Sequence, residues 1–231
     1  MTDYDGEDCV VMLRKCLALA VLIAALSVPA FADGGKVEAT GAFADPSASE
    51  SVRNALEPKG YRVSLADGVV LCDVWLRNGA PIRAKTDVSG AIYTELADST
   101  LIGVVSFPAA TKDYRGQVIK PGAYTLRYEL HPTDGNHMGI SSFRDFLLLT
   151  SVALDQAVDT QFKFEELTKL SAKSSGTNHP LPWSLVLVEG EKSFPSVMEN
   201  EAGHLVLFAK LKTQGGGELP IAIVVKGVAE Q

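Results

Sequence analysis

The strict alternation of apolar and polar residues between positions 124 and 130 constrains the fold more than any other feature of the chain. In an extended strand, one face would carry Tyr124, Leu126, Tyr128 and Leu130. The opposite face would carry Thr125, Arg127 and Glu129. Because successive side chains of a strand point to opposite faces, this pattern predicts a half-buried antiparallel strand.

A β-hairpin is predicted earlier in the chain. Residues 61–66 and 69–76 are rich in apolar and β-branched side chains, and they flank Asp67 and Gly68. The Asp-Gly pair accepts the positive φ angles that a two-residue type I′ turn requires. Similar apolar segments of strand length predict further strands at residues 91–95, 101–107, 117–119, 143–149, 183–188, 204–212 and 219–225.

Helical patterns are confined to two short segments. Ser49 is a typical N-cap residue for a helix that ends before Pro58. Within residues 160–170, apolar side chains recur at helical spacing: Phe162, Leu167 and Leu170. Many short strands with two short peripheral helices favour a mainly-β fold.

We therefore expect a single antiparallel β-sandwich, immunoglobulin-like or transthyretin-like, over residues 61–231. A loose segment that contains the first helix would precede it, at residues 33–60. The chain shows no internal repeat and no low-complexity linker that would divide this domain.

The N-terminal region has the three parts of a secretory signal peptide. Arg14 and Lys15 precede an apolar run at residues 17–26, and Ala30 and Ala32 form the small-residue pattern of a cleavage site. Spanning a membrane takes about 20 apolar residues, so this run predicts a cleaved signal and not an anchor.

The predicted signal covers residues 1–32, with cleavage after Ala32. Residues 1–11 are acidic and contain no lysine or arginine, which does not suit a signal peptide, so we expect translation to start at Met12. The mature protein would be exported by a bacterial cell to the periplasm or the extracellular space, with no stable membrane anchor.

Composition excludes several classes of partner and cofactor. The formal net charge is −7 and no block of basic residues occurs, so a nucleic-acid partner is not expected. Cys72 is the only cysteine beyond the predicted signal, and it lies on the apolar face of a predicted strand. We expect a buried thiol, no internal disulfide and no cysteine-based zinc site.

Residues 130–139 form the most polar candidate for a functional loop. His131, Asp134, Asn136 and His137 lie in it, and Arg144 follows shortly after. We expect this loop to contact an unknown protein or small-molecule ligand. Arg144 and Asp145 interrupt an apolar strand, and they are expected to point outward as a pair or to form a buried ion pair beside the loop.

Two alternatives remain open at this point. His131, Asp134 and His137 have side chains that could bind zinc or another metal, although Asp134-Gly135-Asn136 is also ordinary turn chemistry. A hydrolase with an unrecognised Ser/His site is the other alternative. Phosphate-binding loops, dinucleotide fingerprints and Gly-x-Ser-x-Gly motifs do not occur in the sequence, so no cofactor and no catalytic residue is predicted.

The sequence from Pro121 to Leu126, Pro-Gly-x-Tyr-x-Leu, resembles an element of secreted β-sandwich modules of the carboxypeptidase-regulatory-like and transthyretin-like families. The resemblance implies the same type of sandwich and an accessory, binding or structural role. It implies no functional residues. Together these observations predict an exported, non-catalytic binding or accessory module.

The predicted processing can be tested directly. We expect the exported protein to begin at Asp33, because a signal peptidase cuts after the second small residue of the Ala30-x-Ala32 pattern. N-terminal sequencing of the protein from the extracytoplasmic fraction measures this. Ala30→Arg should accumulate as an uncleaved precursor. A mature protein that begins far from Asp33 would contradict the prediction.

Overall fold

The computed structural model describes residues 34–132, 141–190 and 192–229. The strands are β1 (Lys36–Thr40), β2 (Gly60–Ser64), β3 (Val70–Leu76), β4 (Leu101–Phe107), β5 (Thr111–Lys112), β6 (Val118–Ile119), β7 (Gly122–Leu130), β8 (Asp145–Ser151), β9 (Leu181–Val186), β10 (Ser196–Glu199), β11 (Leu205–Lys212) and β12 (Glu218–Lys226). The helices are α2 (Glu50–Asn54) and α3 (Phe164–Ser175). Among the described residues, no helix has the length and apolar character needed to cross a membrane.

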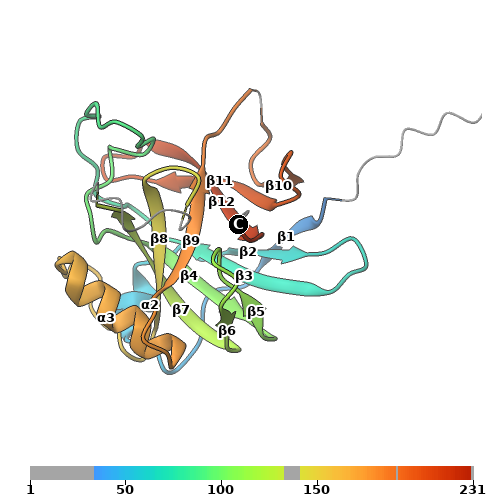
Figure 1. Cartoon of the computed structure of the whole chain (residues 1–231), viewed down its shortest axis with the longest axis horizontal. Helices are drawn as coiled ribbons and strands as arrows, with labels where there is room; N and C mark the ends of the chain where they lie inside the picture. Colours follow the sequence, from blue (N-terminus) through green and yellow to red (C-terminus); the bar gives the residue numbers. More distant parts are fainter. Residues whose placement is uncertain (1–33, 133–140, 191, 230–231) are drawn as a thin grey trace, which may run out of the picture. The chain divides into compact units, whose positions relative to one another are not determined.

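A single antiparallel sheet dominates the structure. Ten strands pair in the order β1-β2-β3-β4-β7-β8-β9-β12-β11-β10, while β5 and β6 form a small separate ribbon. The sheet curls until its edge strands β1 and β10 approach each other, so that it nearly closes into a barrel (Figure 1). The mainly-β fold with two helices is confirmed, whereas an immunoglobulin-like or transthyretin-like sandwich is not.

The two edges of the sheet meet at Gly34. A Cβ atom on Gly34 would lie 2.8 Å from the backbone nitrogen of Glu199, so only glycine allows the backbones to pass this closely. Strand β1 lies in the segment that the sequence predicts to be loose. It pairs with β2 along its whole length, but its side chains are mostly exposed, which explains why no apolar pattern marks it.

The core fills the inside of the curled sheet. Side chains from nearly every strand contribute to it, among them Val74, Val105, Leu126, Leu147, Leu207 and Ile223. Cys72 belongs to the same cluster and is fully buried, as predicted. The free thiol therefore acts as a small core residue.

Strand β7 is buried on both faces, which differs from the predicted half-exposed strand. Its inward row joins the core as expected. Its polar row is also buried, because residues 152–163 lie over it: Thr125, Arg127 and Glu129 are 0–2% exposed. Helix α3 extends this cover across β8, where Leu167 packs on Phe146 and Leu148.

The hairpin between β2 and β3 forms as predicted, but with a longer loop. The Gly68 N–H donates to the Leu65 carbonyl at 2.9 Å, and the Leu65 N–H donates to the Val69 carbonyl at 2.8 Å. Gly68 adopts a left-handed φ of 85°. This is the arrangement of a three-residue loop that ends in a left-handed glycine, and not of a two-residue type I′ turn.

Asp145 holds the end of the sheet together. It is fully buried and accepts hydrogen bonds from the backbone N–H groups of Ile92 and Tyr93, at 2.7 and 2.8 Å, and from the Tyr128 hydroxyl at 2.7 Å. The expected outward pair or ion pair with Arg144 does not form. The strand predicted at residues 91–95 does not form. The backbone N–H groups of Ile92 and Tyr93 donate to Asp145 instead of to a neighbouring strand.

Tyr93 links Asp145 to strands β9 and β12. Strands β9 and β12 pair at only two positions. The Tyr93 hydroxyl lies between them, where it donates to the Val186 carbonyl at 2.7 Å and accepts from the Ala222 N–H at 3.0 Å. Burial raises the pKa of Tyr93, so the hydroxyl keeps the proton that it donates. The Asp145–Tyr93 connection thus supports the narrowest junction in the sheet.

We expect Asp145→Asn to destabilise the protein by about 3 kcal/mol, since an amide nitrogen would face buried donors that need a carboxylate oxygen. Urea unfolding followed by tryptophan fluorescence measures this. Asp73→Asn is the matched control: Asp73 forms a surface ion pair with Arg62, and its loss should cost about 1 kcal/mol or less. Equal losses in the two variants would contradict the role given to Asp145.

Candidate functional site

The structure places two of the predicted site residues at the base of the polar loop. The Arg144 guanidinium donates to the His131 carbonyl from Nε and Nη2, at 3.2 and 3.1 Å. Its Nη1 donates to the Ser89 carbonyl at 3.3 Å, and the His131 N–H donates to the Arg144 carbonyl at 3.0 Å. Arg144 thus ties three chain segments together, and its hydrogen bonds go to backbone atoms.

The remaining predicted site residues, Asp134, Asn136 and His137, lie outside the described residues. Within the part of the chain that is described, no three His, Cys, Asp or Glu side chains gather closely enough to hold a metal ion. His204 is buried, and its Nε2 lies 3.0 Å from the Val228 carbonyl, so it fastens the C-terminal segment. The metal site at His131, Asp134 and His137 stays a prediction.

The most polar buried cluster surrounds Arg127. Its guanidinium forms a bidentate ion pair with Asp155, at 2.7 and 2.9 Å. The remaining N–H groups donate to the carbonyls of Ser99, Ala157 and Thr160, at 2.6 to 3.0 Å. All five donors of the arginine are therefore used within the protein. The cluster fixes the covering segment to β7 and leaves no donor for a ligand.

Glu129 lies beside this cluster without full hydrogen bonding. Glu129 is 2% exposed, and its Oε1 has no hydrogen-bond partner among the residues that the structure describes. Burial raises the pKa of Glu129 to about 8, and the negative charge of Asp98 adds to the effect. Below this pH the folded protein holds Glu129 as a neutral acid. Burial also raises the pKa of Cys72, which disfavours a nucleophilic thiolate.

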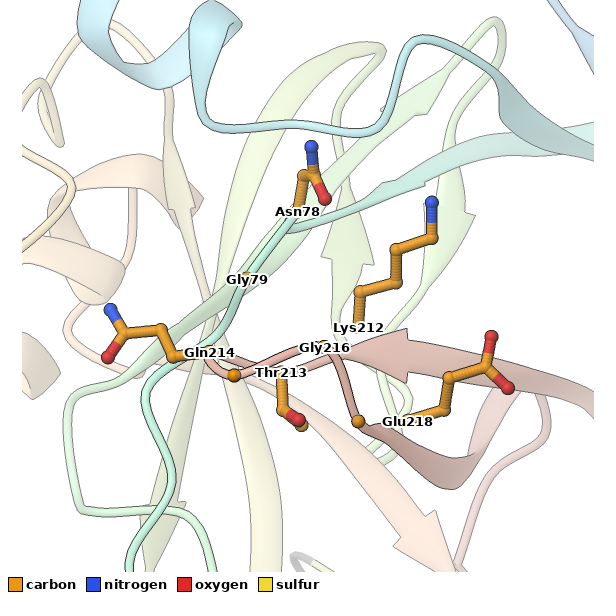
Figure 2. A pocket seen from close by; sticks show the side chains of 9 residues that line it. Asn78, Gly79, Lys212, Thr213, Gln214, Gly216 and Glu218 are labelled. Carbon is orange, nitrogen blue, oxygen red and sulfur yellow. The ribbon is translucent and has the colours of Figure 1, made fainter.

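One surface depression is polar, with a volume of about 650 Å³, and lies beside the loop between β11 and β12 (Figure 2). Its two charged side chains, Lys212 and Glu218, are already ion-paired elsewhere, at 2.8 Å each. Figure 2 shows the amides of Asn78 and Gln214 pointing in different directions. These groups do not converge on a common point, so this depression makes a poor binding site.

A second depression, which we call the end groove, crosses the outer face of β11 and has a volume of about 470 Å³. Its floor is apolar and comprises Val186, Val206 and Phe208. One wall follows β9 and comprises Leu187, Glu189 and Lys192. The other wall comprises the last residue of β10, Glu199, and the turn that follows it, with Asn200, Glu201 and Ala202. Phe143 also lines the groove, next to the Arg144 that holds the predicted loop.

The apolar floor follows from the alternation of β11. Leu205 and Leu207 point into the main core, so Val206 and Phe208 point outward and form a second, smaller cluster. The segment after β9 leaves the sheet and returns as β10, at the top of Figure 1. Val206 and Phe208 are nevertheless only 1% and 6% exposed, because Val186, Val188 and Phe194 pack against this cluster.

Sequence reasoning missed the end groove. Two signals were present: an acidic residue at each of positions 189, 199 and 201, and the strongly apolar residues 205–209, which suit a strand buried on both faces. Neither shows that the two acidic segments line one depression. That arrangement depends on β10 pairing back onto β11.

Comparisons with known proteins identify no relative. No family model matches the chain, and neither the curated proteins nor the solved structures contain a significant match. The resemblance at residues 121–126 therefore stays a prediction.

The raised pKa of Glu129 makes stability depend on pH. The folded pKa lies above the ordinary value of 4.5, so the folded state binds more protons than the unfolded state between pH 4.5 and about 8. The stabilisation that comes from the neutral acid is complete below pH 4.5. The free energy of unfolding should therefore fall as pH rises through this interval and level off beyond it.

We expect Glu129→Gln to remove this dependence, because the amide cannot ionise. Urea unfolding at pH 5, 6.5 and 8 should show the wild type losing on the order of a few kcal/mol relative to the variant. Glu201→Gln, at an exposed position, is the control and should follow the wild type. Parallel profiles for wild type and Glu129→Gln would refute the prediction.

Proposed function

We propose that this protein is an exported, non-catalytic binding protein that contacts another protein through the end groove. The observation that carries the proposal is the groove itself: a surface depression lined by the exposed side chain of Leu187 and by exposed carboxylates from two chain segments. Its volume lies within the range of ligand sites. It also adjoins the base of the loop that the sequence predicts as the contact surface.

The chemistry of the other polar groups supports a binding role over catalysis. Arg127, Asp145 and Asp155 are buried and engaged in hydrogen bonds that hold the fold. The groove walls offer carboxylates, an amide and one ammonium group. They contain no serine, cysteine or histidine among the described residues, and thus none of the usual nucleophile–base pairs.

Because apolar side chains fill the inside of the sheet, we expect a ligand to bind at the outer surface. Buried apolar side chains from both halves of the sheet meet inside it. Exposed apolar patches with a polar rim often mark interaction sites. Leu187, at the end groove, is 46% exposed, and a partner would remove its side chain from water.

Site-specific photo-cross-linking in the native cell tests the proposal. With a benzophenone amino acid at Leu187, we expect one discrete adduct. The same amino acid at Val69, an equally exposed apolar position in the hairpin loop, should give none. Adding Ala202→Trp, which fills the groove from an exposed position, should abolish the adduct.

Ala66→Trp is the matched control for bulk, because Ala66 is exposed in the distant hairpin loop. It should leave the adduct at Leu187 unchanged. Absence of any adduct at Leu187, or an adduct that survives Ala202→Trp, would disprove a protein-binding role for the end groove.

A further inference from the structure

The walls of the end groove carry unpaired negative charge. Glu189, Glu199 and Glu201 are exposed, and none of them forms an ion pair within the described part of the chain. Among the described residues that line the groove, only Lys192 carries an ammonium group. Three carboxylates and one ammonium group give the lining a net charge of −2. A ligand that makes favourable contacts with these carboxylates must itself be cationic.

Lys192 lies over the apolar floor and does not pair with the acidic walls. Its Nζ is 5.1 Å from the centre of the Phe208 ring and 3.8 Å from the Met198 sulfur. The lysine thus shows how a cation can bind here: its methylene groups cover apolar surface while its charge lies over the aromatic face. A partner side chain that reaches Phe208 would displace it.

Exposed apolar side chains border the acidic walls. Leu187 and Met198 are 46% and 45% exposed. Met198 pairs in register with Val206, whose side chain forms part of the floor. The apolar surface available to a partner at the groove thus belongs to Leu187 and Met198, next to the exposed acidic residues, because Val206 and Phe208 are largely buried.

We propose that the end groove binds an extended, cationic segment of a partner protein, in which lysine or arginine side chains alternate with apolar ones. The proposal rests on the proposed function and names the chemistry of the partner. Apolar side chains would cover Leu187 and Met198, the exposed apolar residues at the groove. Basic side chains would reach Glu189 on one wall and the carboxylates of the turn on the other.

Binding of short synthetic peptides to the mature protein tests this proposal. We expect a fluorescein-labelled peptide of alternating leucine and lysine to bind, measured by fluorescence anisotropy, and to weaken as salt is added. A peptide of alternating leucine and glutamate should not bind. Unlabelled spermidine should not displace the leucine–lysine peptide, since it lacks the apolar side chains.

Charge-reversal variants distinguish a specific contact from a general effect of net charge. Reversing both turn carboxylates, Glu199→Lys with Glu201→Lys, should weaken peptide binding about tenfold. Reversing Glu50 and Asp87 to lysine changes the net charge equally at exposed positions elsewhere and should change affinity little. Lys192→Ala should tighten binding about threefold, a gain that damage to the fold could not produce.

The outcomes distinguish this inference from the proposed function. An adduct at Leu187 together with preference for the leucine–glutamate peptide would overturn the cationic partner and leave the binding role intact. Equal effects of the two double reversals would also overturn it. Displacement by spermidine would assign the groove to a small cation and refute a peptide partner. Absence of both the adduct and peptide binding would refute both proposals.

Discussion

The sheet depends on one buried carboxylate. Asp145 gathers two backbone amides and the Tyr128 hydroxyl, and by holding Tyr93 it places a second hydroxyl between β9 and β12. A charged group without partners would be costly in this position, whereas three donors make it favourable. These hydrogen bonds order the irregular segment before β4. They also support the curled sheet between β9 and β12, where only two residue pairs join the strands.

A second buried interaction explains why the outer face of β7 is polar. Arg127 and Asp155 satisfy each other and three backbone carbonyls beneath the segment that leads to α3. The polar row of β7 would suit a strand that faces solvent, but it packs against this segment instead. Glu129, at the end of the same row, lacks a complete set of partners, so this layer couples stability to pH.

These interactions use buried charged side chains for structure, so the proposed binding is assigned to the outer surface. The end groove differs from the polar depression near β12 because its floor is apolar and its acidic groups form no ion pair with any described residue. In the polar depression the charged groups already have partners within the chain, and its amides diverge. Unpaired charge next to exposed apolar surface is what a cationic, partly apolar segment would complement.

The sequence alone was sufficient for the mainly-β class, the two helices, the strand at residues 101–107 and the burial of Cys72, because these follow from local alternation and turn chemistry. It was not sufficient for β1 and β10, whose short edge strands carry little apolar pattern, or for the burial of Arg127 and Asp145. The tertiary structure decided these features, and with them the end groove. Each depends on contacts between residues far apart in the chain, and an alternating pattern shows which face of a strand is apolar but not what covers it.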